Sequence, residues 1–301
     1  TEVSFSDGDG IGGFHNTTGT GWTMAALLST SSGVPYAFPV YSNEDVQKHE
    51  TMASGLTTLG DILSEKGYYQ EFLCGSDAEF GGRKTFFVQH GNYEIFDLFT
   101  AREEGYVPKD YYEWWGFEDK YLFEIAKDEL LELSAKEQPF NFTMLTVDAH
   151  HVEGYVCELC QNTYESQTAN VVSCTDRQVK EFIDWCKVQD FYKDTVIVIQ
   201  GDHPRMDSCL VENIAYYDRT MYNCFINSAV SVEGEIKNRI FTPMDMLPTV
   251  VSAMGFSYDG ERLGLGTNMF SGESTLAEEL GYQNLQHELN RYSKYYQDNF
   301  K

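Results

Sequence analysis

One stretch of sequence decides the expected fold: Thr195-Val196-Ile197-Val198-Ile199-Gln200-Gly201-Asp202-His203. Its first part is apolar and β-branched, which is typical of a buried strand in a parallel sheet. The apolar run ends at a charged pair, Asp202 and His203, which must be solvated, paired or bound to a metal. Open α/β sheets bind their ligands at the carboxyl ends of their strands. The stretch therefore predicts an α/β protein with a polar site at one edge of its sheet.

A glycine-rich turn near the start of the chain is the second informative motif, Gly19-Thr20-Gly21-Trp22-Thr23. It runs into an apolar, helix-like stretch over residues 24–28. This order places the Thr23 hydroxyl over a helix N-terminus, where free N–H groups and the helix dipole stabilise an anion. Gly-x-Gly turns are common as plain connections, so the motif alone does not define a site. Together with the Asp-His pair, a hydroxyl nucleophile indicates a metal-assisted transfer enzyme.

The remaining hydrophobic pattern alternates between helices and strands. We expect helices over 55–66, 119–136, 169–188, 241–254 and 276–300, and strands over 68–74, 140–147 and 195–200. Such alternation implies a mostly parallel central sheet with helices on both faces. No linker, low-complexity run or internal repeat interrupts residues 1–301, so a single catalytic domain is expected.

Composition and charge narrow the function. The 301 residues are 42% hydrophobic, enough for a substantial core, and the net charge is −26. Nucleic acid is excluded as a partner because its phosphates require a basic face. No apolar run reaches the length of a membrane span, and no signal peptide precedes Thr1. Because the sequence starts abruptly with Val3-Ser4-Phe5, we expect an excised piece of a longer protein.

Two further segments are candidate site loops. The turn over 74–83 ends in Arg83, a cation that is either a ligand for substrate or a surface ion-pair residue. Asp148-Ala149-His150-His151 follows a predicted strand, and adjacent histidines at a strand exit are seldom core residues. By contrast, His90 has the setting of a structural histidine. Trp114-Trp115 could form an apolar lip for a lipid or a sugar, although packing is the simpler explanation.

The seven cysteines leave three explanations open. They are Cys74, Cys157, Cys160, Cys174, Cys186, Cys209 and Cys224. Cys157-Glu158-Leu159-Cys160, with Cys174 nearby, could be a zinc cluster, a redox pair or part of a disulfide set. A zinc cluster is disfavoured because the sequence lacks the second half of a paired C-x-x-C arrangement. A thioredoxin-like redox pair is disfavoured because the βαβ context of that motif is absent. A local disulfide in an oxidising compartment is therefore expected, with one cysteine left unpaired.

Several motifs together resemble one known family. They are Thr18–Ala25, Gly33-Val34-Pro35, Thr146–His151, Gly201-Asp202-His203, Met244–Thr249 and Arg262–Thr267. They are similar to the phosphoglycerol transferase branch of the alkaline phosphatase and sulfatase superfamily, which includes lipoteichoic acid synthase and enzymes that add glycerol phosphate to periplasmic glucans. The similarity covers essentially the whole chain. The Gly-Thr-Gly-Trp-Thr block is fairly specific to the glucan-modifying members, whereas Gly-Asp-His is shared across the superfamily.

The resemblance implies an alkaline phosphatase/sulfatase-like α/β fold and a reaction. Glycerol phosphate would pass from phosphatidylglycerol to a cell-envelope glycan through a covalent intermediate on Thr23. Thr23 would also be a metal ligand, together with Asp202 and His203. A divalent metal lowers the pKa of such a hydroxyl and neutralises charge on phosphoryl oxygens. Manganese (Mn2+) is the metal that the family implies, and the oxygen and imidazole donors also suit magnesium (Mg2+) or zinc (Zn2+).

The same resemblance supplies expectations for substrate binding and location. His150 corresponds to a histidine that contacts the phosphoryl group or its leaving oxygen, and is a catalytic candidate. Arg83 falls where the family has a basic residue that binds glycerol phosphate. His151 and Trp22 complete the expected substrate-binding set. A bacterial protein is implied, anchored in the membrane upstream of residue 1, with its catalytic domain outside the cytoplasm.

One departure concerns the fourth metal ligand. In the family it is a glutamate in a Glu-Ser pair at the end of the first strand, several dozen residues before the nucleophile. Only about twenty residues precede Thr23 here. Glu2 is one candidate, but Val3-Ser4-Phe5-Ser6 matches the next segment of the family better. We therefore expect this glutamate to lie upstream of residue 1, which would leave the sheet without one central strand.

Three other functions remain as alternatives. A sulfatase or phosphatase of the same superfamily is disfavoured, because the segment around Thr23 lacks the Pro and Arg of the sulfatase frame Cys/Ser-x-Pro-x-Arg. A phosphoethanolamine transferase also uses threonine, but its zinc site and disulfide pattern differ. A catalytically degenerate domain that binds glycan or lipid would not need Thr23, Asp202 and His203 together.

Overall fold

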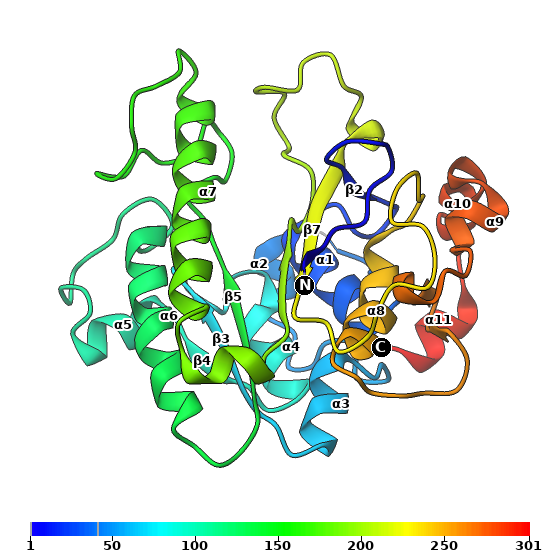
Figure 1. The fold of residues 1–301 in the computed structure, drawn as a ribbon, viewed down its shortest axis with the longest axis horizontal. Coiled ribbons are helices and arrows are strands. Elements are labelled where there is room, and N and C mark those ends of the chain that lie inside the picture. The colour runs from blue at the N-terminus through cyan, green and yellow to red at the C-terminus, as the bar shows by residue number, and fades with distance from the viewer. Residues whose placement is uncertain (1, 41) are drawn as a thin grey trace.

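Two main β-sheets with surrounding helices form the architecture (Figure 1), and β8 (Arg262–Leu263) and β9 (Gly266–Thr267) make a separate two-stranded sheet. The structure is a computed structural model that describes residues 2–40 and 42–301. In the first sheet, β3 (Tyr69–Cys74) lies between β4 (Glu94–Phe96) and β5 (Phe140–Leu145), and both pairings are parallel. Helices α4 (Arg83–Gln89), α5 (Leu98–Glu104) and α6 (Asp119–Ser134) make the crossovers that parallel strands require. The α/β class expected from the sequence is thus confirmed.

The second sheet is built around β7 (Thr220–Ile226). This strand pairs antiparallel with β1 (Glu2–Val3), β2 (Gly13–His15) and β6 (Ile197–Gln200). The apolar run before Asp202 therefore forms a strand, as expected, but its hydrogen-bonded partner is antiparallel. An apolar, β-branched run reports that side chains face a core on both sides, and it does not report the direction of the neighbouring strand.

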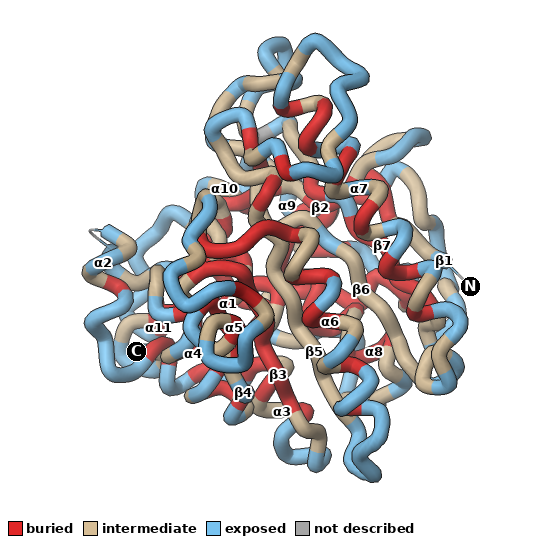
Figure 2. Tube along the Cα trace, turned by 90° about the vertical axis from the view of Figure 1, so that its left-hand side faces the viewer, coloured by how far each residue is buried: buried red, intermediate tan, exposed pale blue. Residues whose placement is uncertain are grey.

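The boundary between the two sheets is open. Among the described residues, β5 has no hydrogen-bonded neighbour on the side away from β3, and β6 has none on the side away from β7. Figure 2 shows the two strands next to each other as half-buried segments. Side chains of both strands pack against the same core cluster. Each strand thus presents free backbone N–H and C=O groups along one edge.

Most of the other helices are close to the expected segments, although α2 was not expected. They are α1 (Thr23–Ser32), α2 (Asn43–Val46), α3 (Leu59–Glu65), α7 (Gln167–Cys186), α8 (Met246–Ala253), α9 (Leu276–Leu280), α10 (Tyr282–Leu289) and α11 (Lys294–Asn299). The expected C-terminal helix is divided into three, because Gly281 takes a positive φ and Ser293 caps a new helix with its side chain. No helix in the described part of the chain has both the length and the apolar composition to cross a lipid bilayer.

Core packing fixes the helix that carries Thr23. Met24, Ala25 and Leu28 on α1 are almost completely buried in a cluster that also contains Phe72 of β3. A second cluster supports the antiparallel sheet, with Phe5, Phe14, Phe225, Phe241 and Phe270 meeting largely edge to face. Helix α1 is therefore packed against the parallel sheet.

Candidate active site

The turn before α1 is stabilised from within. The Thr20 side chain is fully buried; its hydroxyl donates to Asn16 Oδ1 at 2.7 Å and accepts from the Thr17 amide at 2.9 Å. Gly19 has φ +79°, and a Cβ there would come within 2.6 Å of the Tyr36 carbonyl oxygen, so the turn requires glycine. The hydroxyl of Thr20 is thus committed to the turn. α1 then begins at Thr23.

Thr23, Asp202 and His203 meet at one point. Thr23 Oγ1 lies 3.4 Å from His203 Nε2, and Asp202 Oδ2 lies 3.4 Å from the same nitrogen. His203 Nδ1 is 3.0 Å from the Pro204 carbonyl oxygen, which can only accept, so Nδ1 carries a proton and Nε2 faces the site. The structure therefore brings together two side chains that are 180 residues apart in sequence.

This donor set fits the divalent metal that the resemblance implies. Donor atoms that share one ion are about 3–4 Å apart, because each lies about 2.0–2.3 Å from it. Both distances to His203 Nε2 fall in this range. A hydroxyl or alkoxide oxygen, a carboxylate and an imidazole also suit manganese, magnesium or zinc.

His150 lies beside this group. Burial lowers its pKa, and the nearby His151 and His203 lower it further, so the ring is neutral at neutral pH. Its Nδ1 is 2.7 Å from the His151 carbonyl oxygen, which leaves Nε2 without a proton. The ring stacks on His151 with centroids 4.3 Å apart and meets Trp115 edge to face at 5.0 Å. His150 can therefore accept a proton from a bound hydroxyl.

Two residues that the sequence analysis missed hold the His150 loop. Asp119, in the first turn of α6, accepts from the Val147 amide at 2.7 Å and from the Asp148 amide at 3.2 Å. Arg205 donates to the Ala149 carbonyl oxygen at 2.6 Å. The proximity of Arg205 to the Gly-Asp-His motif is the one sequence signal that could have drawn attention to it. These bonds tie the loop to α6 on one side and to the segment after β6 on the other.

Arg83 is buried, so it is not the surface ion-pair residue that the sequence left open. Its guanidinium donates to Ser76 Oγ, the Asp77 carbonyl and the Phe80 carbonyl, all within its own turn. Arg83 also lies over the ring of Phe80. That ring contacts Trp115, which contacts His150. A line of aromatic contacts thus connects Arg83 to the active-site histidine.

Trp22, His90 and the tryptophan pair have clear packing roles. Trp22 is half-buried and packs edge to face on Tyr36. His90 is buried, with Nδ1 2.9 Å from Asp61 Oδ2 and Nε2 2.8 Å from the Met52 carbonyl oxygen. It is structural, as the sequence suggested. Of the tryptophan pair, Trp115 is the one that contacts His150.

Glu2 is not at the site. In the register of the antiparallel sheet, Glu2 and Ile197 both lie opposite Ile226. Asp202 is five residues beyond Ile197, a distance of roughly 16 Å along an extended chain. The Glu2 carboxylate instead lies 3.7 Å from Lys187 Nζ at the end of α7. Glu2 can therefore be rejected as the fourth metal ligand.

The fold and this site define the class of protein. A threonine at a helix N-terminus facing an Asp-His pair at the end of a strand is the arrangement of the alkaline phosphatase superfamily. The chain belongs to the sulfatase family, whose model matches residues 13–256. Members of this superfamily generally depend on divalent metals.

The resemblance to phosphoglycerol transferases is also confirmed. The chain is 31% identical over 266 residues to phosphoglycerol transferase I of Salmonella choleraesuis, covering 85% of this chain and 34% of that protein. Its counterpart in Xanthomonas axonopodis pv. citri is 27% identical over 79% of this chain and 35% of that protein. The chain thus spans about a third of the length of these relatives.

A solved structure supports the fold. The lipoteichoic acid synthase LtaP from Listeria monocytogenes aligns with a TM-score of 0.62 at 18% identity, over 89% of this chain and 66% of that one. At this level of identity, the likeness concerns the fold alone.

Proposed function

We propose that this chain is the catalytic part of a metal-dependent phosphoglycerol transferase. The observation that carries the proposal is the 3.4 Å distance between Thr23 Oγ1 and His203 Nε2 at the N-terminus of α1. The similarity to phosphoglycerol transferase I indicates the group that is transferred. The proposed donor is phosphatidylglycerol and the proposed acceptor is a cell-envelope glycan, as the family resemblance implies.

Thr23 is the proposed nucleophile. Its oxygen attacks the phosphorus of the donor lipid, the bond to the diacylglycerol oxygen breaks, and diacylglycerol leaves after taking up a proton. A glycerophosphoryl group then remains on Thr23, where the free N–H groups of the first turn of α1 stabilise its charge. Thr23, Asp202 and His203 would hold the divalent metal, which lowers the pKa of the threonine hydroxyl and neutralises phosphoryl charge.

His150 is proposed to act in the second half of the reaction. Its unprotonated Nε2 accepts the proton of the acceptor hydroxyl as that hydroxyl attacks the phosphorus. The bond between phosphorus and Thr23 Oγ1 breaks in the same step, and the released threonine oxygen takes up a proton. Arg83, His151 and Trp22 are the proposed substrate contacts. Aromatic contacts run from His150 through Trp115 to Phe80, whose ring lies beneath Arg83. These contacts support binding of the lipid headgroup along this side of the site.

The fourth ligand is proposed to come from a strand of the same protein outside these residues. The open edges of β5 and β6 face each other. One additional strand between them could form backbone hydrogen bonds with both. A carboxylate at its end would lie at the same edge of the sheet as Asp202. We further propose that the intact protein is bacterial, is anchored in a membrane and exposes this domain outside the cytoplasm.

The covalent intermediate gives the sharpest test. In the intact protein, Thr23→Ala should lower glycerophosphate transfer at least about 1,000-fold, because the nucleophile is lost. Thr18→Ala is a matched control on the same turn, since the Thr18 hydroxyl bonds to Gln286. Mass spectrometry of the quenched enzyme should find the glycerophosphoryl group on the peptide that contains Thr23.

Four outcomes would contradict the proposal. Retained transfer by Thr23→Ala would show that another hydroxyl is the nucleophile. Binding of glycan or lipid without turnover by the unaltered protein would instead indicate the degenerate binding domain. Release of inorganic sulfate, or transfer of phosphoethanolamine, would identify the sulfatase or the phosphoethanolamine transferase alternative.

A further inference from the structure

Three cysteines meet outside the active site. Cys157 and Cys160 lie on the irregular segment between β5 and α7, and Cys174 lies on α7. The Cys157 sulfur is 3.7 Å from that of Cys160 and 3.9 Å from that of Cys174, and all three sulfurs lie within 4.8 Å of one another. All seven cysteines are free thiols, so the disulfide expected from the sequence is not formed.

The spacing of the sulfurs matches a shared metal ion. A disulfide bond requires sulfurs about 2.05 Å apart and uses only two of the three. Sulfurs that bind one zinc ion at about 2.3 Å lie about 3.8 Å apart along a tetrahedral edge. Cys157 and Cys174 are buried, and Cys160 is half-buried. The more accessible Cys160 marks the side from which the ion and a water ligand reach the cluster.

Polar neighbours support thiolates at this place. Arg177 Nη2 donates to the Cys174 sulfur at 3.5 Å, and Gln178 Nε2 donates to it at 3.6 Å. Three thiolates and a divalent ion carry a net charge of −1, which the Arg177 guanidinium offsets. Donors of this kind, around the ligand atoms themselves, orient metal ligands and tune the site. The side chains for a sulfur-rich metal site are therefore in place.

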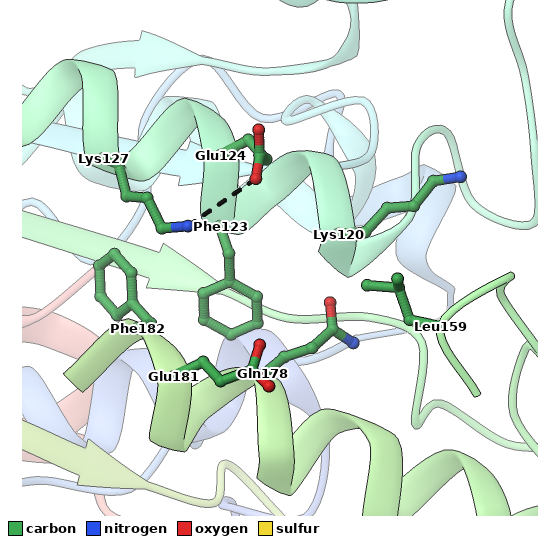
Figure 3. Close-up of a pocket in the computed structure, with 8 residues that line it drawn as sticks. All are labelled: Lys120, Phe123, Glu124, Lys127, Leu159, Gln178, Glu181 and Phe182. Carbon is green, nitrogen blue, oxygen red and sulfur yellow. Dashed lines mark ion pairs between the residues drawn. The ribbon is translucent and has the colours of Figure 1, made fainter. Parts of the chain in front are cut away.

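A small pocket adjoins the cluster (Figure 3). It has a volume of about 60 Å³ between α6 and α7, and Leu159 and Gln178 lie along it. Leu159 belongs to the Cys-x-x-Cys segment, and Gln178 bonds to Cys174. The pocket thus lies alongside the cluster, between the two helices that flank it.

We propose that Cys157, Cys160 and Cys174 bind one thiophilic divalent cation, zinc above others, with water as the fourth ligand. No fourth His, Cys, Asp or Glu joins the three within the described part of the chain. The ion would hold the segment that follows His151 against α7. This segment, residues 152–166, has no regular secondary structure. The bound ion would therefore restrict the conformations of the segment and support the adjoining His150 loop.

Cobalt substitution tests the proposal. The reduced 301-residue protein, stripped of metal and titrated with Co²⁺, should develop the thiolate-to-cobalt charge-transfer absorption that only sulfur ligands give. Cys157→Ser and Cys174→Ser should lose this absorption. Cys209→Ser, which alters a cysteine outside the cluster, should keep it. His203→Ala should keep it as well, which separates this site from the one at Thr23.

A second measurement uses the unaltered protein, in case the serine variants fail to fold. Added Zn²⁺ should protect three thiols from a thiol reagent and protect residues 152–166 from proteolysis, and EDTA should reverse both effects. Two results would overturn the proposal. One is an intact mass showing a disulfide among these cysteines in protein that binds no zinc. The other is a charge-transfer band that persists in folded Cys157→Ser.

Discussion

At the residue scale, two threonine hydroxyls on one turn have opposite environments. Thr20 is fully buried and satisfies both Asn16 and the Thr17 amide. Thr23 is partly exposed, and its hydroxyl faces His203. A hydroxyl that is already bonded on both sides stabilises the turn, whereas one that faces a metal-binding pair is available for chemistry. The sequence alone could not assign these roles, since both residues sit in the same glycine-rich motif.

This difference predicts that substitution of the two threonines has different effects on the free energy of unfolding. Thr20→Ala should lower the free energy of unfolding by about 1–3 kcal/mol, because buried partners lose their hydrogen bonds. Thr23→Ala should change it by less than about 0.5 kcal/mol, since the side chain lies at the edge of a site. Urea unfolding followed by circular dichroism measures both. Equal effects of the two substitutions would contradict the assignment of roles.

A buried carboxylate in β3 predicts a pH effect on stability. Glu71 is almost completely buried, and its Oε1 has no hydrogen-bond partner. Burial, with a smaller contribution from the charge of Glu129, raises the pKa of Glu71 to about 8. A raised pKa means that the folded state holds the proton more tightly than the unfolded state does. The resulting stability is fully present below the unfolded pKa of about 4.3 and is lost as the pH rises to 8.

Glu71→Gln should remove this dependence. At pH 8 the variant should be more stable than the unaltered protein by about 2 kcal/mol or more, while at pH 5 the difference should be much smaller. Glu65→Gln, which alters an exposed glutamate on α3, is the control and should leave the profile unchanged. Parallel pH profiles for Glu71→Gln and the unaltered protein would show that Glu71 does not carry this effect.

At the scale of elements, the first turn of α6 positions an active-site loop. The Asp119 carboxylate is fully buried and receives two backbone amides from the segment that leaves β5. The helix thus acts on the site through the loop. Arg205, on the segment after β6, holds the same loop from the other side.

Asp119→Ala should loosen this loop. The amides of Val147 and Asp148 should exchange their hydrogens faster, because they lose their acceptor, and the free energy of unfolding should fall by about 1–3 kcal/mol. Hydrogen exchange followed by mass spectrometry reports the loop directly. Glu124→Ala, an exposed residue on the same helix, is the control. Unchanged exchange over residues 146–151 in Asp119→Ala would argue against the positioning role.

At the scale of the whole molecule, the site joins three distant parts of the chain at the meeting of two sheets. Thr23 comes from α1, His150 from the segment after β5, and Asp202 and His203 from the segment after β6. The strands that lead to His150 and His203 are the two with open, facing edges. We therefore expect that one additional strand between them would complete both the sheet and the proposed metal site.

This linkage predicts a difference between shorter and longer versions of the protein. The 301 residues alone should bind Mn²⁺ weakly if the proposed fourth carboxylate lies outside them, because each carboxylate ligand supplies charge as well as geometry. A version extended by several dozen upstream residues should bind it more tightly and gain activity. Isothermal titration compares the two, and Glu2→Gln should alter neither. Tight binding by the short version that disappears in Glu2→Gln would contradict this prediction.

The sequence by itself determined the α/β class and the approximate extent of several helices and strands, but not β7, the central strand of the second sheet. It also determined that Thr23 and the Asp202-His203 pair stand at element ends. These features follow from local periodicity and from turn chemistry, which act over a few residues. Only the tertiary structure decided the antiparallel partner of β6, the remote position of Glu2, the burial of Arg83 and the meeting of Cys157, Cys160 and Cys174. Strand pairing, register and burial depend on contacts between segments far apart in the chain, and no local pattern records which segments will meet.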